Sequence, residues 1–237
     1  MTEPIPARQH LMVFGAHPVD PEITCGPVIA KYTRAGHRAT IVYLTLGEAG
    51  NPHMPPEQYK EQKRREVAEA AAVLGADYVV LPYPDSDLPL NREARLAICD
   101  LLRERQPDIV ITHWSHSLSG DHTAAYHLVL DGMRLAASPR LARALPPYRV
   151  PHLYVAENWE DPFGFQPEVY IDVTDTYELW LEAVQTHELV RGGILPFPYL
   201  EYYTALARVR GAEVGVQYAK AFMRVRERRE KCDFFPV

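Results

Sequence analysis

Two short segments of the sequence combine histidine with carboxylate, and each follows an apolar run typical of a buried strand. His17 and Asp20 lie three residues apart in a proline-bounded segment (HPVDPE), and His122 ends a second polar segment (WSHSLSGDH). Two imidazoles and one carboxylate make the three-ligand set of a catalytic zinc site, which leaves a position open for water. Zinc lowers the pKa of that water to about 7, so that it becomes a nucleophile at neutral pH. Ordinary hydrogen-bonded loop histidines remain the alternative at this point.

The order of the elements explains why these segments should meet. Short apolar runs alternate with segments of helical length, which indicates an α/β fold with a mainly parallel sheet and helices on both faces. Ligands of such sheets lie beyond the carboxyl ends of the strands, where both segments begin. We expect strands over 10–16, 38–46, 78–81, 107–113, 153–156 and 169–173, and helices over 27–37, 57–75, 91–105, 122–137, 174–191 and 199–214.

Composition narrows the class of protein. The chain has 237 residues, which suits one domain over 1–237. With 25 Lys+Arg against 31 Asp+Glu, it has no basic block for nucleic acid, and we expect a small-molecule substrate. No apolar run reaches membrane-spanning length and the N-terminal segment lacks the pattern of a secretory signal, so we expect no membrane partner. Three cysteines without a C-x-x-C pair also favour a cytoplasmic location.

Several motifs together resemble the LmbE-like, or PIG-L, family of zinc deacetylases. The segment AHPVDPEITCG is similar to the family's A-H-P-D-D signature, and TLGEAG is similar to its T-x-G-E-x-G. The segment KRRE resembles the family's R-R-x-E helix, and GDH the end of its H-P-D-H. The resemblance implies a Rossmann-like fold and a zinc ion held by His17, Asp20 and His122. It also implies removal of an acetyl group from an N-acetylglucosamine unit.

Two positions depart from the family pattern. Val19 stands where the deacetylases have the aspartate that acts as general base, and Ser119 stands where they have a histidine that stabilises the tetrahedral intermediate. Loss of a general base typically costs about 10²–10⁴-fold in rate. The usual deacetylase mechanism therefore cannot be transferred unchanged.

Three functions are compatible with these departures. The first, which we rank highest from the sequence, is hydrolysis of an amide or ester, with Glu22, Glu48 or Asp121 as substitute base and His116 in place of the missing histidine. The second resembles the 4-oxalomesaconate hydratase branch of the family, which adds water to a double bond of a carboxylated substrate. The third is binding without turnover.

A carboxylated substrate would need a cation near the metal. The segment Lys63-Arg64-Arg65 offers three, although at least two of them are expected on the solvent face of their helix. We count Arg64 with Asp85 and Ser119 as candidate substrate contacts. Asp85 matches a substrate-contacting aspartate of the family, and an Asx-type turn is its structural alternative. Because relatives often form dimers or hexamers, the resemblance also implies a homo-oligomer.

Overall fold

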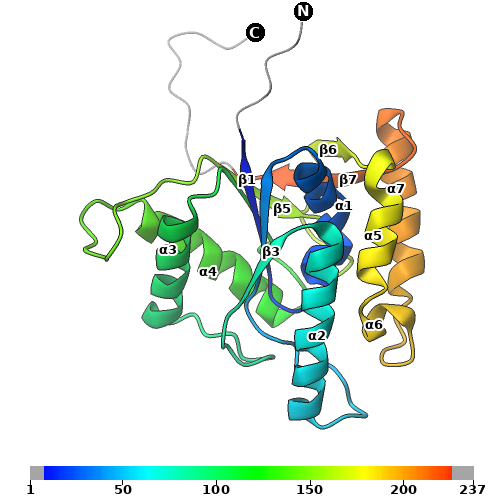
Figure 1. Cartoon of the computed structure of the whole chain (residues 1–237), viewed down its shortest axis with the longest axis horizontal. Helices are drawn as coiled ribbons and strands as arrows, with labels where there is room; N and C mark the ends of the chain where they lie inside the picture. The colour runs from blue at the N-terminus through cyan, green and yellow to red at the C-terminus, as the bar shows by residue number, and fades with distance from the viewer. Residues whose placement is uncertain (1–7, 226–237) are drawn as a thin grey trace, which may run out of the picture.

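A single twisted sheet forms the centre of the molecule. The computed structural model describes residues 8–225 and contains seven strands in the order β3-β2-β1-β4-β5-β7-β6 (Figure 1). The strands β3, β2, β1, β4 and β5 are parallel, and β7 runs antiparallel to both β5 and β6. The sequence-based expectation of a mainly parallel α/β sheet is therefore confirmed. The strands are β1 (His10–Gly15), β2 (Arg38–Tyr43), β3 (Asp77–Val80), β4 (Ile109–Thr112), β5 (His152–Ala156), β6 (Val169–Asp172) and β7 (Ala219–Arg224).

Helices cover both faces of this sheet. The helices are α1 (Asp20–Arg34), α2 (Pro56–Leu74), α3 (Arg92–Arg105), α4 (Gly120–Ala136), α5 (Tyr177–Val184), α6 (Glu188–Arg191) and α7 (Tyr199–Val214), with a 3-10 turn η1 (Thr174–Thr176) before α5. Figure 1 shows α3 and α4 on one side, and α1 and α2 on the other with α5 beside them. On β1, Met12 and Phe14 pack toward the α3 and α4 side, whereas Leu11 and Val13 pack toward α1 and α2. Successive side chains of the strand thus point to opposite faces of the sheet and pack into two separate hydrophobic cores.

Local signals fix where the helices that follow the strands begin and end. Gly75 ends α2 with φ 66°, a left-handed conformation that glycine adopts without steric cost. Ser119 caps α4 because its side chain accepts a hydrogen bond from the backbone N–H of His122 at 3.4 Å. This cap places Asp121 and His122 in the first turn of α4, directly beyond the end of β4. No helix within residues 8–225 is long and apolar enough to cross a membrane.

The second half of the chain differs from the expectation. The helix expected over 174–191 is interrupted, because the chain leaves the helical path at His187 (φ −83°, ψ 123°) before α6 begins. Strand β7 was not expected at all. It is short, it carries a lysine near its start, and it pairs with strands that lie far away in the sequence. The helix expected over 27–37 begins earlier, at Asp20, so that part of the polar segment after β1 forms the first turn of α1.

Candidate metal centre and pocket

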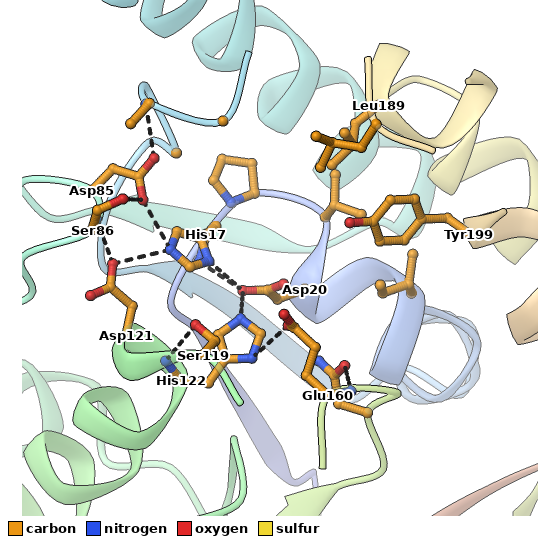
Figure 2. Close-up of a pocket in the computed structure, with 18 of the residues that line it drawn as sticks. His17, Asp20, Asp85, Ser86, Ser119, Asp121, His122, Glu160, Leu189 and Tyr199 are labelled. Carbon is orange, nitrogen blue, oxygen red and sulfur yellow. Dashed lines mark hydrogen bonds and ion pairs between the residues drawn. The ribbon is translucent and has the colours of Figure 1, made fainter. Parts of the chain in front are cut away.

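Three side chains from the carboxyl ends of two neighbouring strands converge on one point. His17 follows β1, Asp20 is the first residue of α1, and His122 lies in the first turn of α4 (Figure 2). The Oδ2 atom of Asp20 lies 3.2 Å from Nδ1 of His17 and 3.2 Å from Nε2 of His122. One ligand atom from each of the three residues lies within 4.8 Å of the others. The set of two histidines and one aspartate on the wall of an open pocket fits a catalytic zinc site.

In both His17 and His122, the ring nitrogen that does not face Asp20 lies beside a carboxylate. Nε2 of His17 lies 3.1 Å from Oδ1 of Asp85 and 3.2 Å from Oδ2 of Asp121, and Nδ1 of His122 lies 3.2 Å from Oε2 of Glu160. Metal-ligating histidines commonly donate their other N–H to a carboxylate, which fixes the ring orientation and the tautomer. The group of His17, Asp85 and Asp121 also has metal-ligand spacing.

Backbone hydrogen bonds hold carboxylates of both groups in place, since Oδ2 of Asp20 accepts the backbone N–H of His17 at 2.9 Å. Asp121 accepts backbone hydrogen bonds from Ser86 at 2.7 Å and Leu88 at 3.2 Å, and Asp85 accepts one from Ala49 at 2.8 Å. Asp85 and Asp121 both contact Nε2 of His17 and so orient its ring, whereas the group around Asp20 joins two histidines and is the better candidate metal centre.

The charges within the centre favour an ionised Asp20. Burial alone would raise its pKa, but the imidazoles of His122 and His17 hold the pKa of Asp20 well below its usual value. His113 braces the same turn, because its Nε2 accepts a hydrogen bond from the backbone N–H of Ala16 at 2.9 Å and its ring stacks on that of His122. An ionised carboxylate is the form that binds a divalent metal.

The centre opens into a cavity of about 390 Å³, and the other side of this cavity is largely apolar. That side is lined by Val19, Ile23, Trp159, Leu189 and Tyr199. Figure 2 places Leu189 and Tyr199 across the pocket from the cluster around Asp20. Burial raises the pKa of Tyr199 to about 12, so its hydroxyl stays protonated and can donate a hydrogen bond. The volume suits a small organic substrate.

Val19 joins the two ligands of the first segment in a strained turn. It has φ 89° and ψ −40°, and its side chain is buried. A β-branched residue at positive φ is an outlier, and such strain costs about 1–3 kcal/mol. The backbone N–H of Val19 donates to Oε2 of Glu22 at 3.0 Å, which is one half of a capping box. Valine offers no oxygen for the other half, and it places no carboxylate on the pocket.

Behind this turn lies a buried ionic network, here called the Glu22 cluster, which consists of Glu22, Tyr43, Lys63, Glu66 and His187. Nε2 of His187 lies 3.2 Å from Oε1 of Glu22, and its Nδ1 lies 3.4 Å from Oε2 of Glu66. The hydroxyl of Tyr43 donates to Glu22, and Nζ of Lys63 donates to Oε2 of Glu66 at 2.7 Å. Although burial favours a neutral imidazole, the two glutamates raise the pKa of His187.

The candidate residues from the sequence fall into two groups. Those that line the pocket are His17, Asp20, Asp85, Ser119, Asp121 and His122. Glu22, Glu48, Arg64 and His116 are absent from the lining among the described residues. Glu22 is fully enclosed in its cluster, and Arg64 is exposed and paired with Glu61.

The remaining two also lie outside the lining of the pocket. His116 is exposed on the β4–α4 segment, where Nδ1 lies 2.7 Å from Oγ of Ser115. Glu48 lies beside Lys60 and the backbone of Asp85, and its Oε2 atom has no hydrogen-bond partner among the described residues. The structure therefore does not bring Glu22, Glu48, Arg64 or His116 to the pocket.

Two pocket residues were missed or undervalued. Glu160 follows β5, so the same strand-end rule that selected His17 could have selected it. Lys63, and not Arg64, lines the pocket, because it lies on the buried stripe of α2 with Tyr59, Glu66 and Val67. The spacing of these four positions follows the helical period, so it could have identified Lys63 as the inward-facing cation.

The chain is similar to known proteins in both sequence and fold. The model of the family described as PIG-L, GlcNAc-PI de-N-acetylase, matches residues 12–133, just over half of the chain. The sequence is 25% identical over 230 residues to 4-oxalmesaconate hydratase of Pseudomonas putida, covering 90% of this chain and 85% of that protein. It is 28% identical over 202 residues to diacetylchitobiose deacetylase of Thermococcus kodakarensis, covering 79% and 72%. A conserved protein of Thermus thermophilus has a similar structure, with a TM-score of 0.82, 29% identity and coverage of 94% and 97%.

Proposed function

Because the chain belongs to the PIG-L family, whose relatives include both deacetylases and a hydratase, we propose that it is a zinc-dependent enzyme that adds water to a double bond of a small carboxylated substrate. His17, Asp20 and His122 hold the metal in this proposal. Bound there, zinc would supply a Lewis acid and a water molecule of pKa about 7. The observation that carries the choice of reaction is the apolar Val19 at the position of the deacetylase base.

The other residues of the centre hold the ligands in place. Asp85 and Asp121 accept from the N–H of His17, and Glu160 accepts from that of His122. Asp121 is the one residue among the three base candidates from the sequence that lines the pocket. Burial alone would raise the pKa of Asp121, but hydrogen bonds from His17 and from two backbone N–H groups lower it. A carboxylate held in this way is a weak base and a good orienting group.

Lys63 supports a substrate with a carboxylate. It is the one lysine or arginine among the described residues that lines the pocket. Its side chain is buried, and Glu66 is its single hydrogen-bond acceptor in the range 8–225. An ammonium group has three N–H donors, so two remain for an anionic group in the cavity. Lys63 therefore takes the cationic role that the sequence assigned to Arg64.

Deacetylation of a sugar is the second candidate, and Trp159 favours it. This side chain lines the pocket, and one face of its ring stacks on Phe197 with 4.0 Å between ring centroids. An aromatic ring fixed in this way can pack against the apolar face of a sugar. Ser119 also lines the pocket, where it could contact such a substrate.

Two assays on the zinc-loaded protein separate these functions. Unsaturated dicarboxylates are followed by the absorbance of the double bond, and N-acetylglucosamine derivatives by release of free amine. We expect loss of absorbance that a chelator abolishes, and a Lys63→Met variant with a raised KM. Release of amine without hydration would replace the proposal by the deacetylase function, and absence of both signals would leave binding without turnover. Homo-oligomer formation and a cytoplasmic location stay predictions.

A further inference from the structure

We propose that His187 is a positioning residue. By holding Glu22 and Glu66 in place, it fixes the metal-binding turn and the position of Lys63 in the pocket. The proposal rests on the metal centre of the proposed function. His187 itself touches neither the pocket nor a proposed metal ligand among the described residues. Its side chain is fully buried, and its two ring nitrogens face Glu22 and Glu66.

The first glutamate connects His187 to the metal-binding turn. Oε2 of Glu22 accepts the backbone N–H of Val19, whose positive φ places His17 and Asp20 on either side of one turn. A conformation this unfavourable for valine persists only where surrounding contacts determine it. Glu22 can supply that constraint because its other oxygen is itself held, by the hydroxyl of Tyr43 and by Nε2 of His187.

The second glutamate connects His187 to the pocket. Oε2 of Glu66 is the hydrogen-bond partner of both Nδ1 of His187 and Nζ of Lys63. The other oxygen, Oε1, accepts the backbone N–H of Glu188, the residue after His187. One imidazole therefore holds two carboxylates at fixed positions, and these carboxylates hold the turn of the metal ligands and the cation that faces the substrate.

The local chain path shows that His187 is placed for these contacts. Helix α5 ends at Val184, and the backbone N–H of His187 still donates to the carbonyl of Val184 at 3.3 Å. The chain then becomes extended at His187 before the single turn of α6. An uninterrupted helix, as expected from the sequence over 174–191, would not have this kink at His187, where the imidazole enters the core.

The test compares zinc affinity, measured by competition with a chromophoric chelator, with hydrogen exchange of the Val19 amide in the metal-free protein, measured by NMR. For His187→Phe we expect zinc affinity to fall measurably but by less than the about 10–100-fold typical of a group hydrogen-bonded directly to a metal ligand, because His187 acts through Glu22. The Val19 amide should exchange faster. Tyr43→Phe, which removes a single donor to Glu22, should act in the same direction more weakly and covers the case in which His187→Phe does not fold.

Two further variants distinguish positioning from general stabilisation. His10 is also buried, hydrogen-bonded to the carbonyl of Arg105 and to Thr40 at the opposite end of β1, so His10→Phe should leave zinc affinity unchanged. In a Val19→Gly background, glycine adopts the positive φ without strain. The effect of His187→Phe on zinc affinity should shrink there, because the two residues act through one turn.

Unchanged zinc affinity and Val19 exchange in His187→Phe would overturn the proposal, as would an equal loss of affinity in the Val19→Gly background. A wild-type protein that takes up no zinc would contradict the metal centre itself. In that case the exchange rate of the Val19 amide in the metal-free variants still decides the role of His187.

Discussion

The first turn of α1 has two faces that carry similar side chains in opposite settings. On one face, Asp20 meets the rings of His17 and His122 beside an open cavity. On the other, Glu22 meets His187 and Tyr43 without exposed surface. Both are carboxylates bound to imidazole. The first face opens to the cavity, whereas Glu22 on the second face has no access to it and holds the turn in place.

The largest expected effect is a loss of zinc binding from a change on the open face that leaves the closed face intact. Asp20→Ala removes the shared carboxylate of the open face, and it should weaken zinc binding by more than the about 10–100-fold typical for an outer partner. Because the Glu22 cluster stays intact, the apo protein should still fold. Metal analysis after dialysis measures the loss, with Asp175→Ala as an exposed aspartate control. Wild-type zinc content in Asp20→Ala would mean that another group holds the metal.

The closed face should show the reverse pattern, with a large effect on stability. Glu66→Gln leaves Lys63 and His187 buried without their shared carboxylate. Breaking a buried ion pair in this way costs about 3–5 kcal/mol of unfolding free energy. Urea unfolding of the metal-free protein measures this cost.

Glu69→Gln is the matched control, because Glu69 is an exposed glutamate on the same helix. It should change the free energy of unfolding by less than about 0.5 kcal/mol. Equal values for the two variants would show that the Glu22 cluster does not stabilise the fold.

A smaller effect on zinc affinity is expected at Glu160, which contacts a proposed metal ligand and does not bind the metal itself. Glu160→Gln keeps the shape of the side chain but removes the negative charge beside Nδ1 of His122. Zinc affinity should fall by about 10–100-fold, less than for Asp20→Ala, and urea unfolding of the apo protein should change little. Unaltered affinity would remove Glu160 from the metal centre and assign it to the substrate side of the pocket.

The sequence predicts that the three proposed ligands of the open face lie together, but it does not predict the closed face, for a physical reason. His17, Asp20 and His122 follow adjacent parallel strands, and the strand-end rule predicts that such residues lie close together, while the family resemblance implies that they bind the metal. The Glu22 cluster joins residues up to 165 positions apart in the chain, and its centre depends on the kink at His187. A helical pattern over 174–191 contains no signal for that kink.

The same limit explains particular misplacements. Lys63 and Arg64 are both cations, so residue type does not distinguish them, whereas the buried stripe of α2 includes Lys63 and not Arg64. The sequence pattern does not predict strand β7, because a six-residue segment with an internal lysine lacks the apolar pattern of a strand. The burial or pairing of each of these positions depends on residues that are distant in the sequence, so a local sequence pattern does not predict it.

Lys220 allows a final test, because it extends the closed face with a cation that has no carboxylate within ion-pair distance among the described residues. Its Nζ donates to the carbonyl of Ile23 at 2.7 Å, on the same turn of α1, and lies over the ring of Trp180. Burial lowers the pKa of Lys220 from 10.5 to about 7. The folded state therefore binds this proton less readily than the unfolded state does.

The sign of the pH dependence follows. Above pH about 7 the folded protein has lost the proton on Lys220 while the unfolded chain keeps it up to about pH 10.4, so stability should rise with pH in this window. One proton corresponds to a slope of at most about 1.4 kcal/mol per pH unit. Urea unfolding between pH about 7 and about 8.5 should show a shallower slope in Lys220→Met than in the wild type, with the variant more stable at the lower pH. Parallel slopes would mean that Lys220 stays charged when folded and that the carbonyl of Ile23 and the ring of Trp180 are sufficient to hold the charge.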